Sequence, residues 1–177
     1  AAIDACDEAL TLLLPAGPSE ALAEVLRWKG TILRDRGSHS AAAELYAQSL
    51  AVADSFGHQP SRAHALNCLG TIAQLRGDLS AAERSSGEAA RIAHRLSDRR
   101  LSGMVQQNLG VLADVQGRTD EAIAHFRLAL VAFGHVLVGG LRWEQNRLVL
   151  SRPARLHLAA LLAALLVLLG IRYWLGR

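Results

Sequence analysis

Histidine, cysteine and serine side chains are the groups in this sequence that could bind a metal ion or attack a substrate. The histidines are scattered along the chain, as His39, His58, His64, His94, His125, His135 and His157. No HExxH motif occurs, and no acidic residue completes a metal site with two of them. Ser85 and Ser86 lack the turn of a nucleophilic serine, and no glycine motif for phosphate is present. We therefore expect no metal site, no cofactor and no enzymatic activity.

The two cysteines, Cys6 and Cys68, belong to no CxxC motif and to no cluster with metal-ligand spacing. Both fall on the apolar stripes of expected helices, which is typical of cysteine used as a small buried hydrophobic residue. We interpret both as packing residues.

Charge is distributed unevenly along the 177 residues, which have a formal net charge of +3. Residues 135–177 contain six arginines and one acidic residue, whereas residues 1–134 contain 13 basic and 15 acidic residues. Residues 1–134 therefore have a net charge of −2. Such a surface binds a phosphate backbone poorly, so we expect no nucleic acid partner. RNA binding by a helical array is kept as an alternative, which would require a basic groove. The preference for arginine over lysine indicates a GC-rich, bacterial coding sequence.

A repeat of 40 residues organises the first part of the chain. Segments that begin at Leu26, Leu66 and Gln106 align without a gap. They share three columns of small residues: Gly30, Gly70 and Gly110, then Gly37, Gly77 and Gly117, then Ala42, Ala82 and Ala122. Glycine inside a helix costs about 1 kcal/mol relative to alanine, so the first column predicts close approach of a neighbouring helix. The second column is suited to end a helix, and apolar residues beyond it recur at helical spacing.

Each copy is therefore expected to be a helical hairpin, at residues 20–59, 60–98 and 99–134. Residues 1–14 match the second helix of an earlier, truncated hairpin. Stacking buries the apolar stripe that a lone hairpin would expose, so we expect an all-α fold, an α-solenoid of antiparallel hairpins over residues 1–134. Because the chain starts in mid-helix without methionine, we interpret it as a fragment of a longer protein.

These columns resemble the tetratricopeptide repeat family, in its long-period branch of about 40 residues. The small residue of the family's first helix corresponds to the glycine column that begins at Gly30. The family's aromatic residue in the second helix corresponds to Tyr46 and Phe126, and its NLG signature is complete at 108–110. Lys29 and Ser86 depart from the pattern.

The resemblance implies a concave groove that is lined by the first helix of each hairpin and binds a protein or peptide partner. In the family, ligand-facing side chains lie three residues before, one after and four after the small residue. Those positions are Arg27, Thr31 and Arg34, then Asn67, Thr71 and Gln74, and then Gln107, Val111 and Asp114. They lack the lysine-rich pattern of a carboxylate clamp, and the alternative that they are only solvated helix faces stays open. The resemblance also implies a scaffold within a larger bacterial signalling or regulatory protein.

The last 43 residues have no repeat columns. Residues 135–155 are expected to be an irregular basic linker, for which a hairpin that turns at Gly139 and Gly140 and an irregular capping helix are both open. Residues 156–175, LHLAALLAALLVLLGIRYWL, predict a hydrophobic helix long enough to span a bilayer. Membrane insertion there, with the repeats in the cytoplasm, would make the protein an adaptor anchored to the inner membrane. A helix that caps the solenoid and a shifted reading frame are the alternatives.

Overall fold

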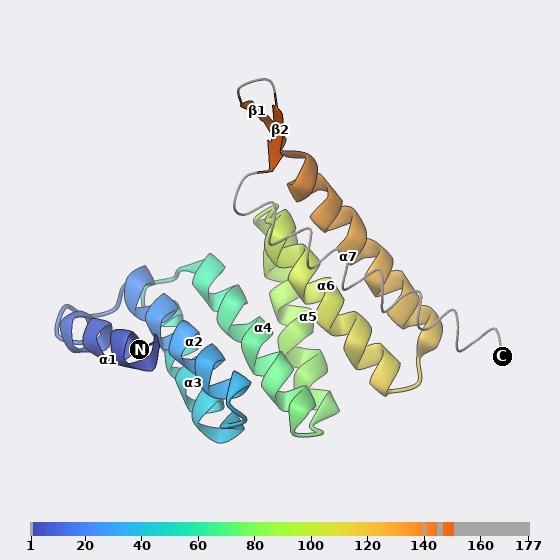
Figure 1. The fold of residues 1–177 in the computed structure, drawn as a ribbon. Helices are drawn as coiled ribbons and strands as arrows, with labels where there is room; N and C mark the ends of the chain where they lie inside the picture. Colours follow the sequence, from blue (N-terminus) through green and yellow to red (C-terminus); the bar gives the residue numbers. More distant parts are fainter. Residues whose placement is uncertain (1, 140, 145–146, 151–177) are drawn as a thin grey trace. The chain divides into compact units, whose positions relative to one another are not determined.

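The computed structural model describes residues 2–139, 141–144 and 147–150. Within these residues there are seven helices: α1 Ala2–Leu13, α2 Glu20–Asp35, α3 His39–Ser55, α4 Gln59–Leu75, α5 Leu79–Arg95, α6 Arg99–Val115 and α7 Thr119–Gly139 (Figure 1). The repeat pattern predicts helices near residues 1–14, 20–36, 40–56, 60–76, 80–96, 99–116 and 119–134. The observed ends agree with these to within one residue, except that α7 continues beyond residue 134 to Gly139. The reason is that Gly134 lies inside the helix and does not end it, since glycine only weakens a helix.

The chain divides into two compact units, Ala1–Leu96 and Ser97–Arg177. In the first unit α2 pairs with α3 and α4 pairs with α5, while α1 packs against α2 and α3 packs against α4 (Figure 1). In the second unit α6 pairs with α7. The predicted fold class, an all-α solenoid built from antiparallel helical hairpins, is confirmed. The continuity of the array over residues 1–134 stays a prediction.

Positive backbone φ angles recur at the turns with the period of the repeat. Gly37, Gly77 and Gly117 follow the first helix of each hairpin and have φ angles of 79°, 81° and 74°. A second series lies between hairpins, where Gly57 has a φ of 69° and the equivalent residue Ser97 has a φ of 54°. Ser97 therefore adopts a left-handed conformation that glycine would adopt at a lower cost.

Helix caps differ between the two hairpins of the first unit. Asp78 Oδ1 accepts a hydrogen bond from the Ala81 N–H at 2.9 Å at the start of α5. Ser38, at the start of α3, makes no capping hydrogen bond with its side chain. We therefore expect Asp78→Ala to lower the free energy of unfolding of this unit by about 1 kcal/mol. Ser38→Ala, the matched control, should change it by much less. Urea denaturation measures both, and equal losses would contradict this assignment of the caps.

Close packing between the two helices of a hairpin explains the first glycine column. A Cβ atom on Gly30 would lie 2.7 Å from Tyr46 Cε1, and one on Gly110 would lie 2.8 Å from Phe126 Cε1. Both rings are fully buried. Gly70 faces Ser86 instead of an aromatic ring. The glycines are needed because the facing side chain occupies the space of a Cβ atom.

The second unit contains another glycine contact of this kind, between α6 and α7. A Cβ atom on Gly103 would lie 2.6 Å from Phe133 Cε1. Forty residues earlier the two positions hold Ala63 and Ala93, both buried. The exchange of two alanines for a glycine and a phenylalanine preserves the fit, because the smaller residue makes room for the larger one.

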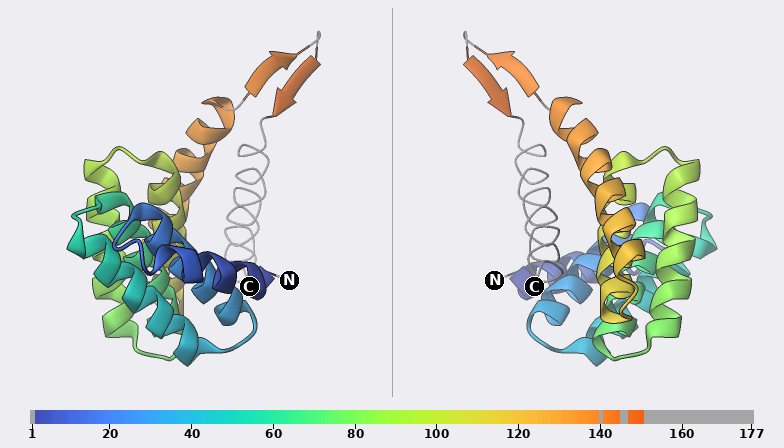
Figure 2. Two further views of the ribbon diagram at one scale, coloured as in Figure 1. Left: turned by 90° about the vertical axis from the view of Figure 1, so that its left-hand side faces the viewer. Right: turned by 90° about the vertical axis from the view of Figure 1, so that its right-hand side faces the viewer.

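After α7 the described residues form two strands, and both follow Gly139, whereas the hairpin that the sequence left open would turn at residues 139–140. Strand β1, Leu141–Glu144, pairs antiparallel with β2, Arg147–Leu150, and this pair of strands follows directly from the end of α7 (Figure 2). The expected hydrophobic helix at 156–175 lies outside the described residues. In the part of the chain that the structure describes, no helix is both long and apolar enough to cross a membrane.

Candidate protein interaction face

The site residues predicted for the first two hairpins all lie on α2 and α4 of the first unit. We call this set the inner face: Arg27, Thr31, Arg34, Asn67, Thr71 and Gln74. Helices α2 and α4 contact each other although α3 separates them in the chain. Cys68 of α4 interacts with Arg27 and Arg34 of α2. The structure therefore brings these six positions together.

Arg27 is held in place within its own helix. Its Nη2 and Nε atoms donate to the Glu24 carboxylate at 2.5 Å and 3.2 Å, and its guanidinium lies 4.5 Å from the ring centroid of Trp28. Burial alone would lower the pKa of Arg27, but the hydrogen bond and charge of Glu24 outweigh it and raise that pKa. Arg27 is a rigid, fully charged part of the face.

Threonine hydroxyls on the inner face are already used by the protein. Thr31 Oγ1 donates to the Arg27 carbonyl at 3.1 Å and accepts from Tyr46 Oη at 3.1 Å. Thr71 Oγ1 donates to the Asn67 carbonyl at 3.1 Å. Burial raises the pKa of Tyr46, so its hydroxyl stays protonated and able to donate. The Tyr46 bond joins α3 to α2, and the other two bonds hold each threonine against its own helix, so these side chains are ordered before any partner binds.

Accessibility separates the six positions of the inner face. Asn67 is only 4% exposed, whereas Arg34 and Gln74 are partly exposed. Arg34 pairs with the neighbouring Asp35, with Nη2 2.7 Å from Oδ1. Leu75, next to Gln74, is 53% exposed. Asn67 is therefore the one buried position of the six, and the other five are partly exposed.

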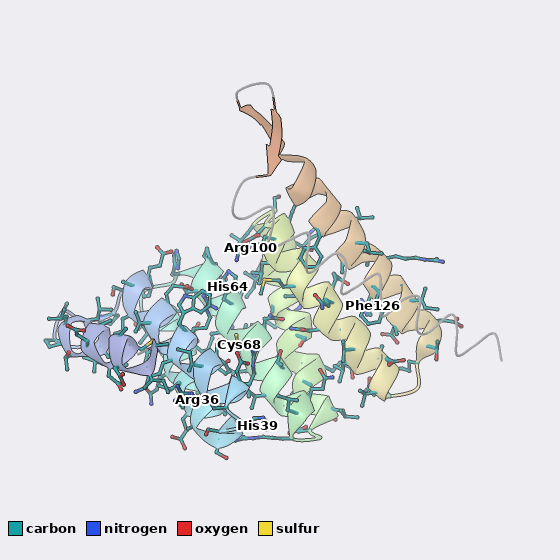
Figure 3. All side chains as sticks on the ribbon, in the orientation of Figure 1. Arg36, His39, His64, Cys68, Arg100 and Phe126 are labelled. Carbon is teal, nitrogen blue, oxygen red and sulfur yellow. The ribbon has the colours of Figure 1, made fainter. Side chains whose placement is uncertain are left out.

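Sequence reasoning did not place Trp28 and Cys68 on this face. Cys68 lies at the position in α4 that Trp28 has in α2, forty residues apart, and His64 lies one turn before it (Figure 3). Trp28 is 52% exposed, and its indole N–H donates to Glu24. The repeat register could have identified both residues, because each directly follows the first residue of the predicted triplet.

Burial raises the pKa of the Cys68 thiol, although Arg27 and Arg34 act in the opposite direction. Only the thiolate is nucleophilic, so we expect native Cys68 to react slowly with an alkylating agent at pH 8. Its rate should rise only at a higher pH than that of an ordinary cysteine. A Cys6→Ser variant isolates the measurement, with the urea-unfolded chain as control. Equal rates in the native and unfolded chains would contradict a buried thiol.

The three site residues predicted for the last hairpin lie on α6 of the second unit. Gln107 and Val111 are partly buried, and Asp114 is exposed. Val111 packs against the core cluster of Ala113, Ala122 and Phe126. Phe126 is labelled in Figure 3. Val111 therefore contributes to the core of this hairpin.

Several histidines have hydrogen-bond partners that position them structurally. His58 Nδ1 lies 2.9 Å from Ser61 Oγ, and His125 Nδ1 lies 2.7 Å from Gln106 Oε1. No group of three potential ligands for a metal ion occurs among the residues that the structure covers. The absence of a metal from the whole chain stays a prediction.

Comparison with known proteins supports the repeat assignment. Residues 61–132 match the family model described as tetratricopeptide repeat. The solved structure of BtubC from P. vanneervenii is similar with a TM-score of 0.58 and 18% identity, over 89% of this chain and 65% of BtubC. MamA is similar with a TM-score of 0.52 and 20% identity, over 77% of this chain and 73% of MamA. At these identities the two structures show a shared fold alone. A search of curated proteins found no significant match.

Proposed function

Because residues 61–132 match the tetratricopeptide repeat family model, we propose that the chain is a protein-interaction scaffold whose inner face binds a segment of a partner protein. The observation that carries the proposal is the preorganised pair of helices α2 and α4. In α2, Glu24 fixes Arg27 and Tyr46 fixes Thr31, and in α4 Thr71 is bonded to the Asn67 carbonyl, while Arg34 and Gln74 are partly exposed. A face that is already ordered loses little conformational entropy when it binds.

The partner that fits this face is a segment with mixed polar and apolar side chains. Arg34 and Gln74 offer hydrogen-bond donors to backbone carbonyls, and Trp28 and Leu75 offer exposed apolar surface. Because Glu24 and Asp35 balance Arg27 and Arg34, a strongly charged partner gains little here. Repeats of this family are typically non-catalytic scaffolds, and we assign the chain no reaction.

Paired substitutions test the inner face. The full chain serves as bait in an extract of the source cells, and bound proteins are quantified by mass spectrometry. We expect Arg34→Ala with Gln74→Ala to reduce a defined set of captured proteins by about tenfold. Gln48→Ala with Arg84→Ala, at exposed positions of α3 and α5, should leave that set unchanged. Equal capture by both variants, with equal helix content by circular dichroism, would refute the proposal.

A second candidate function is a membrane-anchored adaptor within a larger bacterial signalling protein. The apolar run at 156–175, outside the described residues, favours it. Its test is membrane fractionation of the full chain beside a chain that ends at residue 150. Retention of only the full chain after a carbonate wash supports an anchor, and recovery of both in the soluble fraction rejects it.

A further inference from the structure

The end of α5 differs in charge from the rest of the first unit. Residues 1–96 contain nine basic and eleven acidic residues, a net charge of −2. The last two turns of α5 nevertheless contain Arg91, His94 and Arg95 without an acidic residue. No ion pair is formed by these three among the described residues, and the same holds for Arg36, Arg76 and Arg84 of this unit, so what distinguishes the end of α5 is that its unpaired basic residues are clustered. This end of α5 is therefore a local positive patch.

A cavity of about 510 Å³ lies beside this patch, where α4 begins and α5 ends. It is lined by Gln59, Arg62, Ile92, Arg95 and Leu96. Ile92 is buried and Leu96 is 40% exposed, so part of the wall is apolar. The cavity can accept an apolar side chain.

The two arginines of the cavity differ in how their charge is balanced. Arg62 Nε donates to Asp54 Oδ1 at 2.8 Å, and its Nη2 donates to Glu88 Oε1 at 2.5 Å. Two carboxylates therefore neutralise Arg62 and hold it against α3 and α5. Arg95 is exposed and has no such carboxylate among the described residues. The charge that Arg95 offers is available to a ligand.

Basic residues near a helix C-terminus also interact favourably with the helix dipole. That effect accounts for His94 and Arg95 in the last turn. It does not account for Arg91 one turn earlier or for the exposed apolar side chain of Leu96 at the cavity. A ligand explains all of these features together.

We propose that the cavity and the basic end of α5 bind an acidic segment of a partner protein that carries an aliphatic side chain beside its carboxylates. The aliphatic side chain packs on Ile92 and Leu96, and the carboxylates pair with Arg91 and Arg95. Guanidinium groups bind carboxylates through two parallel hydrogen bonds, and the positive patch steers an acidic segment to it. This surface lies at the end of the α4–α5 hairpin and does not depend on the inner face.

The test uses the full chain and a fluorescent peptide of alternating glutamate and leucine, with binding followed by fluorescence anisotropy. We expect Arg91→Glu with Arg95→Glu to weaken binding by about tenfold. The matched control is Arg76→Glu with Arg84→Glu, which makes the same change in net charge at exposed positions of the same unit. The control should weaken binding by less than about threefold, because its charges lie farther from the peptide.

Two further measurements separate a specific site from general attraction of negative charge. Leu96→Ser, or a peptide with alanine in place of leucine, should weaken binding by about fivefold, because the apolar contact is lost. Equal losses from the two charge variants would overturn the proposal. Undiminished binding of the alanine peptide, or equally tight binding of an RNA oligonucleotide of the same charge, would also overturn it.

Discussion

Phe126→Ala is expected to lower the free energy of unfolding of the second unit by about 3–5 kcal/mol. The ring is fully buried between α6 and α7 and packs with Ala113 and Ala122. A loss of this size is a large part of the stability of a small domain, about 5–15 kcal/mol. Hydrogen exchange of the α6 and α7 amides measures it, and unchanged protection there would contradict the packing.

The glycine opposite this ring provides an internal check on the same prediction. Gly110→Ala alone should destabilise by about 1–3 kcal/mol, because its Cβ atom would overlap the Phe126 ring. In the Phe126→Ala background the same substitution should stabilise by about 1 kcal/mol, since alanine favours the helix and the space is free. Gly87→Ala in α5, where a Cβ atom meets nothing within 4 Å, should stabilise in either background. If Gly110→Ala stabilises in the presence of Phe126, close packing does not explain the glycine column.

Tyr46→Ala is the substitution with the largest expected effect in the first unit, a loss of about 3–5 kcal/mol. The side chain is fully buried, fills the space beside Gly30 and donates a hydrogen bond to Thr31. Tyr46→Phe keeps the ring and removes only the hydroxyl, so it should cost about 1 kcal/mol. Urea denaturation compares the two variants, and equal losses would show that the ring itself contributes nothing.

The fold could be predicted from the sequence because its main determinants repeat. Glycine columns and apolar spacing of three, four and seven residues are visible without any knowledge of contacts, and they located every helix start. The contact between Gly103 and Phe133 was not visible in the sequence. Each of the two residues differs from the alanine at the equivalent position of the previous repeat, and only their contact in the structure explains both differences. The full length of α7 is not visible in the sequence either, because the repeat pattern ends at residue 134 and the helix continues to Gly139.

The candidate site could be predicted only as a set of positions. The family spacing placed six side chains on α2 and α4, which the structure brings together. Their accessibility depends on packing between helices that are distant in sequence. The Tyr46 hydroxyl that binds Thr31 comes from another helix, and the burial of Asn67 depends on its neighbours. The pairing of Arg27 with Glu24, three residues apart, was available from helical spacing alone.

Hydrogen–deuterium exchange of the full chain, with and without a captured partner, tests the proposed function most directly. The account predicts new protection in α2 and α4 when the partner binds, and no new protection when Arg34 and Gln74 are both alanine. Protection confined to α3 and α5, or protection that the double substitution leaves intact, would contradict binding at the inner face.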